Sequence, residues 1–114
     1  MIAIIDYGVG NLKSMQKAVE ISGLKAVITS DYNTASRASG LILPGVGAFA
    51  PAMKVIRQNK LDVLFGKFAA LKKPVLGICL GMQLFFDVSE EGGRNRGLGY
   101  FKGRVRFFPK KKGL

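Results

Sequence analysis

The fold is decided by the stretch Val75-Leu76-Gly77-Ile78-Cys79-Leu80-Gly81, where a short apolar run leads through two glycines into a segment of helical character. The run Val75–Ile78 is typical of a buried strand, and the pattern of Gly81–Val88 predicts a helix. Cys79 stands two residues from either glycine. This spacing is that of a nucleophile elbow, a sharp strand-to-helix turn that lifts its central side chain above a sheet. A Cβ at either glycine would collide with the neighbouring strand or helix.

The residues alone leave two interpretations of Cys79 open. In the functional one it is a nucleophile, and the N–H of Leu80 points toward the oxyanion that its attack would create. In the other it is a small apolar side chain that packs at the end of a strand. An internal disulfide is excluded because Cys79 is the only cysteine, and a Cys/His zinc site is excluded because the chain has no histidine.

The rest of the chain alternates between predicted strands and helices, and its 114 residues are the length of one domain. Further strands are expected at Ile2–Asp6, Lys25–Thr29, Gly40–Leu43 and, as one or two strands with a possible hairpin turn at Gly103, within Leu98–Phe108. Helices are expected at Leu12–Ser22, Phe49–Asn59 and Leu61–Leu71, with short helical potential at best in Ser30–Ser39. The order predicts an α/β fold, a mostly parallel sheet with helices on both faces.

Two of these helices have apolar stripes that we expect to be buried. The stripe of the first helix comprises Leu12, Met15, Ala18, Val19 and Ser22. The stripe of the last comprises Leu61, Leu64, Phe65, Phe68 and Leu71.

Three glycine-rich turns follow strands and are therefore expected at the carboxyl edge of the sheet, where ligands bind in such folds. The second, Pro44-Gly45-Val46-Gly47, could turn its N–H groups toward a carbonyl oxygen, or it could be an ordinary turn. The first, Tyr7-Gly8-Val9-Gly10, is no dinucleotide fingerprint, because Lys13 stands where the third glycine is needed. Gln83 could face Cys79 from the next helical turn or face solvent.

The net charge of +11 is concentrated near the C-terminus. Residues 92–114 carry eight Lys/Arg and no acid, whereas residues 1–91 carry ten Lys/Arg and seven acids. This pattern indicates a local docking surface or an anionic ligand rather than a chain that binds nucleic acid throughout. Nucleic-acid binding is expected to be weak and easily lost with salt. No apolar run is long enough to span a bilayer and no signal peptide is recognised, so a cytoplasmic location is expected.

Taken together, these segments resemble the class I glutamine amidotransferases, and more narrowly the glutaminase subunits of imidazole glycerol phosphate synthase in histidine biosynthesis. The resemblance runs the length of the chain. It rests on the motifs Asp6-Tyr7-Gly8-Val9-Gly10-Asn11, Leu43-Pro44-Gly45-Val46-Gly47, Gly77-Ile78-Cys79-Leu80-Gly81-Met82-Gln83, Ser89-Glu90-Glu91 and Gly97-Leu98-Gly99. It implies a flavodoxin-like amidotransferase domain, of which residues 1–114 are the N-terminal part.

The resemblance also implies roles for individual residues. Cys79 is expected to attack the side-chain amide of glutamine, giving a glutamyl thioester and ammonia. The N–H groups of Leu80 and Val46 are expected to form the oxyanion hole, which can require the Val46 peptide to rotate first. Substrate glutamine is expected to be held at four positions: Gly45, Gly47, Gln83 and Glu91. The ammonia is expected to pass to a (β/α)₈-barrel synthase subunit, and neither a cofactor nor a metal is expected.

One departure from the family pattern is decisive for activity. Family members complete a Cys-His-Glu triad in their C-terminal half, and this chain has no histidine. The 114 residues alone are therefore expected to be inactive. The alternative function is a binding module without enzymatic activity, which docks through its basic C-terminal segment. Glutamine protection of Cys79 against labelling would separate the two.

Overall fold

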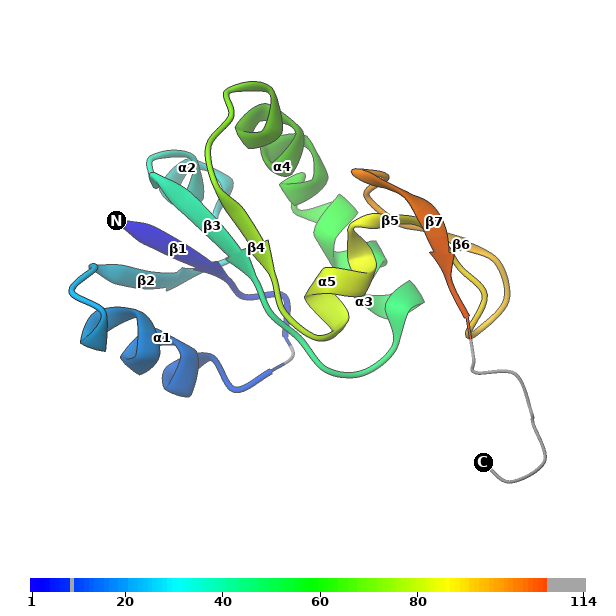
Figure 1. Ribbon diagram of the computed structural model, residues 1–114, viewed down its shortest axis with the longest axis horizontal. Coiled ribbons are helices and arrows are strands. Elements are labelled where there is room, and N and C mark those ends of the chain that lie inside the picture. Colours follow the sequence, from blue (N-terminus) through cyan, green and yellow to red (C-terminus); the bar gives the residue numbers. More distant parts are fainter. Residues whose placement is uncertain (9, 107–114) are drawn as a thin grey trace.

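The computed structural model describes residues 1–8 and 10–106, and these form two sheets connected through a short helix (Figure 1). Val9 of the first glycine turn, Phe107 and Phe108 of the last predicted strand, and the lysines at 110–112 lie outside the described residues. The elements in chain order are β1 (Ile2–Ile5), α1 (Leu12–Ile21), β2 (Ala26–Thr29), α2 (Tyr32–Ser36), β3 (Gly40–Leu43), α3 (Phe49–Gln58), α4 (Leu61–Ala70), β4 (Val75–Gly77), α5 (Leu80–Leu84), β5 (Phe86–Ser89), β6 (Asn95–Arg96) and β7 (Phe101–Val105).

The larger sheet has four parallel strands in the order β2-β1-β3-β4. Helices connect successive strands, as parallel pairing requires. Because all four strands run the same way, the turns after β1, β3 and β4 lie at one edge of the sheet, as the sequence predicted. The parallel α/β architecture is confirmed.

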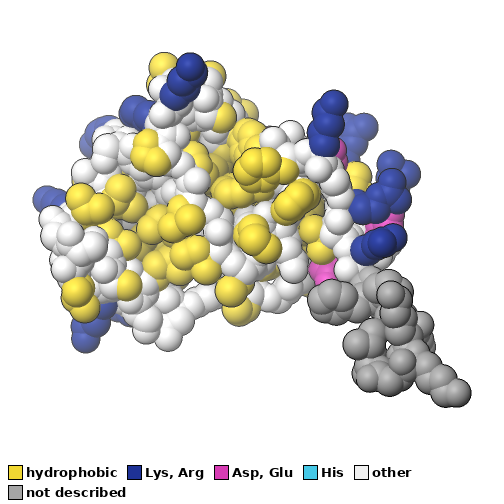
Figure 2. Space-filling model, viewed as in Figure 1, with side chains coloured by type: hydrophobic (Ala, Val, Ile, Leu, Met, Phe, Trp, Pro, Cys, Tyr) yellow, Lys and Arg dark blue, Asp and Glu magenta, His cyan; other side chains and the backbone are white. Residues whose placement is uncertain are grey.

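The two faces of this sheet are covered to different extents. Side chains of β1 and β3 that face one side pack with α2, α3, α4 and α5 into the main core, whose largest members include Phe65 and Phe68. On the other side α1 is the only helix among residues 1–8 and 10–106 that packs, over a small cluster of Ile4, Ala26 and Ile42. Figure 2 shows apolar side chains left in view on this second face. They border a groove lined by residues such as Leu24 and Leu76, which are 53% and 54% exposed.

The stripe predicted for α1 is only partly correct. Leu12, Met15 and Val19 are half-buried against the second cluster, while Ala18 and Ser22 are exposed. The ends of the helix agree with the prediction: the Asn11 side chain accepts a hydrogen bond from the N–H of Ser14, and Gly23 follows the C-cap with φ +94°.

In α4 the first four stripe residues are buried, but Leu71 is 68% exposed. The helix has ended at Ala70, so Leu71 lies in the turn that follows and no longer faces the core.

The predicted helix Gly81–Val88 is wrong in its second half, which forms strand β5. The helix stops because its last carbonyls are taken by a distant segment: the N–H of Leu98 donates to the Leu84 oxygen at 2.7 Å, and that of Tyr100 to the Phe85 oxygen at 2.8 Å. A continuing helix would need these same acceptors.

The smaller sheet has the order β6-β5-β7, and it corrects the hairpin expected at Gly103. Gly103 lies inside β7, and β7 pairs in parallel with β5 instead of folding back on itself. The Gly103 N–H donates to the Asp87 carboxylate at 3.3 Å, which ties the two strands together. Within the described residues, no helix has the length and apolar character needed to cross a membrane.

Replacing Gly97 with alanine is expected to destabilise the contact between α5 and the smaller sheet. Its Cβ would lie 2.2 Å from the Phe86 carbonyl oxygen and 2.8 Å from that of Leu84, and backbone atoms cannot move aside cheaply. We expect Gly97→Ala to lower the free energy of unfolding by about 1–3 kcal/mol or more. Gly92→Ala is the matched control, because nothing lies within 4 Å of its Cβ position. Urea denaturation of both variants checks this, and equal midpoints would contradict it.

Candidate functional site

Cys79 sits between β4 and α5 in a backbone conformation that side-chain-bearing residues rarely adopt. Its φ is +54° and its ψ is −121°, and the side chain is exposed. Such strain persists only where the surroundings impose it. The geometry is that of a nucleophile elbow, as the glycine spacing predicted.

The two flanking glycines are required by direct contacts. A Cβ on Gly77 would lie 2.5 Å from the Phe85 ring and 2.8 Å from the Met82 Cα. A Cβ on Gly81 would lie 1.7 Å from the Leu43 carbonyl oxygen. The elbow can therefore press against the end of β3 only because neither position carries a side chain.

The turn after β3 runs beside the elbow and is joined to it by backbone hydrogen bonds. The Ile78 N–H donates to the Leu43 oxygen at 3.0 Å, and the Leu80 N–H donates to the Gly45 oxygen at 3.1 Å. Gly45 and Gly47 have φ of +144° and +111°, and Val46 between them is 61% exposed. The N–H expected to stabilise an oxyanion is thus occupied by the carbonyl of Gly45.

All seven residues singled out from the sequence line one recess of about 320 Å³, a size within the roughly 300–1,000 Å³ typical of ligand pockets. They are Cys79, Leu80, Val46, Gly45, Gly47, Gln83 and Glu91. Met82 also lines it and was missed, although it lies three residues after Cys79 and so faces the same side of α5.

Glu91 reaches the recess from the far end of β5, and a buried serine accounts for its position. Ser89 is fully buried, and its hydroxyl accepts a hydrogen bond from the Glu91 N–H at 3.3 Å. Only the Ser-Glu-Glu motif itself could have indicated this role of Ser89. Among the described residues, no group of three Cys, His, Asp or Glu side chains could hold a metal.

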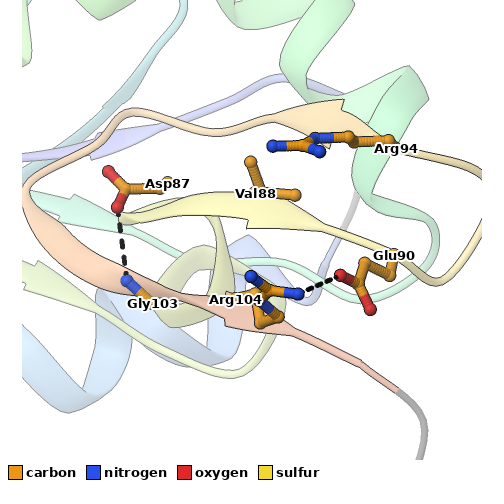
Figure 3. A pocket seen from close by; sticks show the side chains of 6 residues that line it. All are labelled: Asp87, Val88, Glu90, Arg94, Gly103 and Arg104. Carbon is orange, nitrogen blue, oxygen red and sulfur yellow. Dashed lines mark hydrogen bonds and ion pairs between the residues drawn. The ribbon is translucent and has the colours of Figure 1, made fainter.

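Glu90 turns to a different recess, on the smaller sheet (Figure 3). Its carboxylate pairs with Arg104 at 2.9 Å, and Arg94 also lines this recess. Both partners of the pair are well exposed, and exposed pairs contribute little stability. Figure 2 shows Lys and Arg side chains gathered on this part of the molecule, with acidic groups among them. The described part of the basic segment thus lies beside a recess that shares no lining residue with the Cys79 recess.

The first glycine turn packs against the turn after β3. Tyr7 is 5% exposed, and its hydroxyl donates to the carbonyl oxygen of Pro44. Burial raises the pKa of Tyr7 to about 12. A Cβ on Gly10 would lie 3.5 Å from the Gly45 Cα, so the two turns touch through their backbones. Sequence reasoning noted Tyr7 only as part of a motif.

Comparison with known proteins agrees with this geometry. The family described as "Glutamine amidotransferase class-I" matches residues 3–109. Proteins named imidazole glycerol phosphate synthase subunit HisH are similar: that of Archaeoglobus fulgidus is 52% identical over 109 residues (96% of this chain, 53% of the relative), and that of Lacticaseibacillus casei is 48% identical over 114 (100% and 55%). The chain spans about half the length of these curated relatives.

A solved structure described as a crystal structure of glutamine amidotransferase superposes with a TM-score of 0.77 at 17% identity. It covers 93% of this chain, and the chain covers 56% of it. At this identity the likeness concerns the fold.

Replacing Gly81 with alanine is expected to disrupt the elbow. The added Cβ would overlap the Leu43 carbonyl, so either β3 or α5 must move. We expect a loss of about 3 kcal/mol or more in the free energy of unfolding, at the upper end for overpacking. Gly66→Ala is the control, since its nearest neighbour is 4.0 Å away in the middle of α4, where alanine favours the helix. Thermal unfolding measures both; a Gly81→Ala variant as stable as Gly66→Ala would contradict the elbow contact.

Proposed function

The chain belongs to the class I glutamine amidotransferase family, and on this premise we propose that it carries the nucleophile of a glutaminase that supplies ammonia to a synthase subunit in histidine biosynthesis. The observation that supports this best is the single recess, which gathers Cys79 and the six other residues expected to act with it. The similarity to HisH subunits over nearly the whole chain supports the pathway.

In the proposed reaction, the Cys79 sulfur attacks the side-chain amide carbon of glutamine. A C–S bond forms, the carbonyl oxygen becomes an oxyanion, and the C–N bond then breaks with transfer of a proton to the leaving nitrogen. Water cleaves the resulting thioester to glutamate and restores the thiol. The exposed position of Cys79 at the top of the elbow gives the substrate access to it.

The oxyanion hole must be opened before it can work. The Leu80 N–H is hydrogen-bonded to the Gly45 oxygen, and oxyanion donors have to point at the developing charge. Rotation of the Gly45–Val46 peptide would remove this carbonyl and bring the Val46 N–H into the recess. The positive φ of Gly45 and Gly47 supports such a rotation, since glycine passes between these conformations with little steric penalty.

The rest of the recess is suited to holding free glutamine. The carboxylate of Glu91 can pair with the α-ammonium group of the amino acid, and the Gln83 amide can donate and accept hydrogen bonds. Gly45 and Gly47 leave room for the substrate close to the backbone.

One requirement of the reaction is not met within these 114 residues. The chain contains no histidine to act as the general base and acid, and the relatives are about twice as long. We propose that a second half-domain supplies the histidine and glutamate. The apolar groove beside β4, with Leu24 and Leu76 half exposed, supports packing of further structure on this face. A (β/α)₈-barrel synthase subunit would then receive the ammonia.

We expect residues 1–114 alone to react with iodoacetamide at Cys79 but to release no ammonia from glutamine above background. Alkylation needs only an accessible thiol, whereas amide hydrolysis also needs the general acid–base, worth about 10²–10⁴-fold. Mass spectrometry follows the label, and an ammonia assay follows turnover. Cys79→Ala should remove the label and change nothing in the assay.

Adding the C-terminal half of the Archaeoglobus fulgidus relative as a separate chain should raise ammonia release. If residues 1–114 release ammonia at an enzyme-like rate that Cys79→Ala abolishes, another residue of this chain serves as the base and the proposed division of the site is wrong.

A further inference from the structure

Tyr7 places a buried hydroxyl against the turn that carries the oxyanion donors. It lies two residues after the end of β1, and its side chain belongs to the main core. Its O–H donates to the Pro44 carbonyl oxygen. Because burial raises the pKa of Tyr7 to about 12, the hydroxyl keeps its proton at neutral pH and remains a donor.

Three hydrogen bonds hold the successive carbonyl groups of residues 43–45, and the one from Tyr7 is in the middle. The Leu43 oxygen accepts from the Ile78 N–H at 3.0 Å, the Pro44 oxygen from Tyr7, and the Gly45 oxygen from the Leu80 N–H at 3.1 Å. The first continues the pairing between β3 and β4 and need not change. The third must break if Leu80 is to stabilise an oxyanion. The Tyr7 bond therefore lies at the border between fixed and movable backbone.

The same carbonyl also lies close to the backbone of α5. The Pro44 oxygen lies 3.0 Å from the Cβ position of Gly81, at the start of α5. Pro44 itself is buried, as is Gly45, whereas Val46 and Gly47 are exposed. The turn thus has a clamped first half and an open second half.

We infer that Tyr7 is a positioning residue for the oxyanion hole: by holding the Pro44 carbonyl, it confines rotation of the turn to the Gly45–Val46 peptide. This inference rests on the proposed glutaminase function. Without the hydroxyl, the Pro44 carbonyl loses its donor and the turn can reorient from the end of β3 onward. The N–H groups of Val46 and Leu80 then converge on the substrate carbonyl less often. Tyr7 transfers no proton and does not touch the substrate.

The first test measures how fast two electrophiles react with Cys79, in the 114-residue chain and in its Tyr7→Phe variant. The chloromethyl ketone analogue of glutamine presents a carbonyl oxygen to the oxyanion hole, and the Cys79 sulfur displaces its chloride. Iodoacetamide alkylates the same sulfur by simple displacement of iodide. We expect Tyr7→Phe to lower the rate with the ketone by about three- to tenfold, as loss of a buried hydrogen bond would. The iodoacetamide rate should stay within about twofold, because it does not use the hole.

Tyr100→Phe is the matched control. Tyr100 is half-buried and, like Tyr7, has a raised pKa, but its ring packs on Phe85. Its ratio of ketone to iodoacetamide rates should equal that of the unmodified chain. If folded Tyr7→Phe has the same ratio of ketone to iodoacetamide rates as the unmodified chain, the inference is overturned.

A second measurement decides the role of Tyr7 without any glutamine chemistry. NMR relaxation dispersion should show exchange confined to residues 45–47 and Leu80 in the unmodified chain, and spreading to Leu43 and Ile78 in Tyr7→Phe. Unchanged exchange would contradict the inference. If glutamine does not protect Cys79 of the unmodified chain against the ketone, the proposed function fails. The NMR result still tests whether Tyr7 holds the Pro44 carbonyl.

Should Tyr7→Phe not fold, site-specific 3-fluorotyrosine at position 7 replaces it. The more acidic phenol is a stronger donor and keeps the shape of the side chain. Conformational exchange limited to fewer residues around Gly45 and Val46 would support the inference that Tyr7 holds the Pro44 carbonyl. Exchange identical to that of the unmodified chain would contradict it.

Discussion

The structure depends on one contact between backbones, where the start of α5 lies against the end of β3. A Cβ at Gly81 would fall 1.7 Å from the Leu43 carbonyl oxygen, so the approach is possible only for glycine. This closeness lets the Ile78 and Leu80 N–H groups continue the pairing of β3 and β4 past the ends of the strands. It also forces Cys79 into its left-handed conformation. The exposed sulfur and the neighbouring turn are both results of this single constraint.

Short-range patterns in the sequence were enough to predict the parallel sheet and the elbow. The strands β1 and β3 are uninterrupted apolar runs. The two glycines spaced around Cys79 form a short motif that is typical of a nucleophile elbow. The misjudged segments depend on partners distant in the chain. Nothing within Gly81–Val88 indicates that the carbonyls of Leu84 and Phe85 are claimed by Leu98 and Tyr100, and so the strand β5 could not be foreseen.

The site shows the same division between local and distant causes. The residues around Cys79 and in the turn after β3 follow from motifs, and Met82 could have been added from helical spacing alone. The blocked state of the Leu80 N–H, by contrast, depends on which way the Gly45 carbonyl points, and a sequence with two glycines permits either direction. The Tyr7 hydroxyl meets Pro44 only because β1 and β3 are neighbours in the sheet.

Among the described residues that line the recess, Glu91 alone comes from beyond α5, and its N–H is hydrogen-bonded to Ser89 of the smaller sheet. Cys79 and the turn after β3 belong to the larger sheet and its edge. The recess is therefore bordered by both sheets, with the Cys79 sulfur on the side of the larger one and the Glu91 side chain on the side of the smaller one. Under the proposed function, a shift of the smaller sheet would move Glu91 relative to Cys79 without breaking the backbone hydrogen bonds that hold the elbow to the turn after β3. The separation of nucleophile and carboxylate is thus set by how the two sheets are held together.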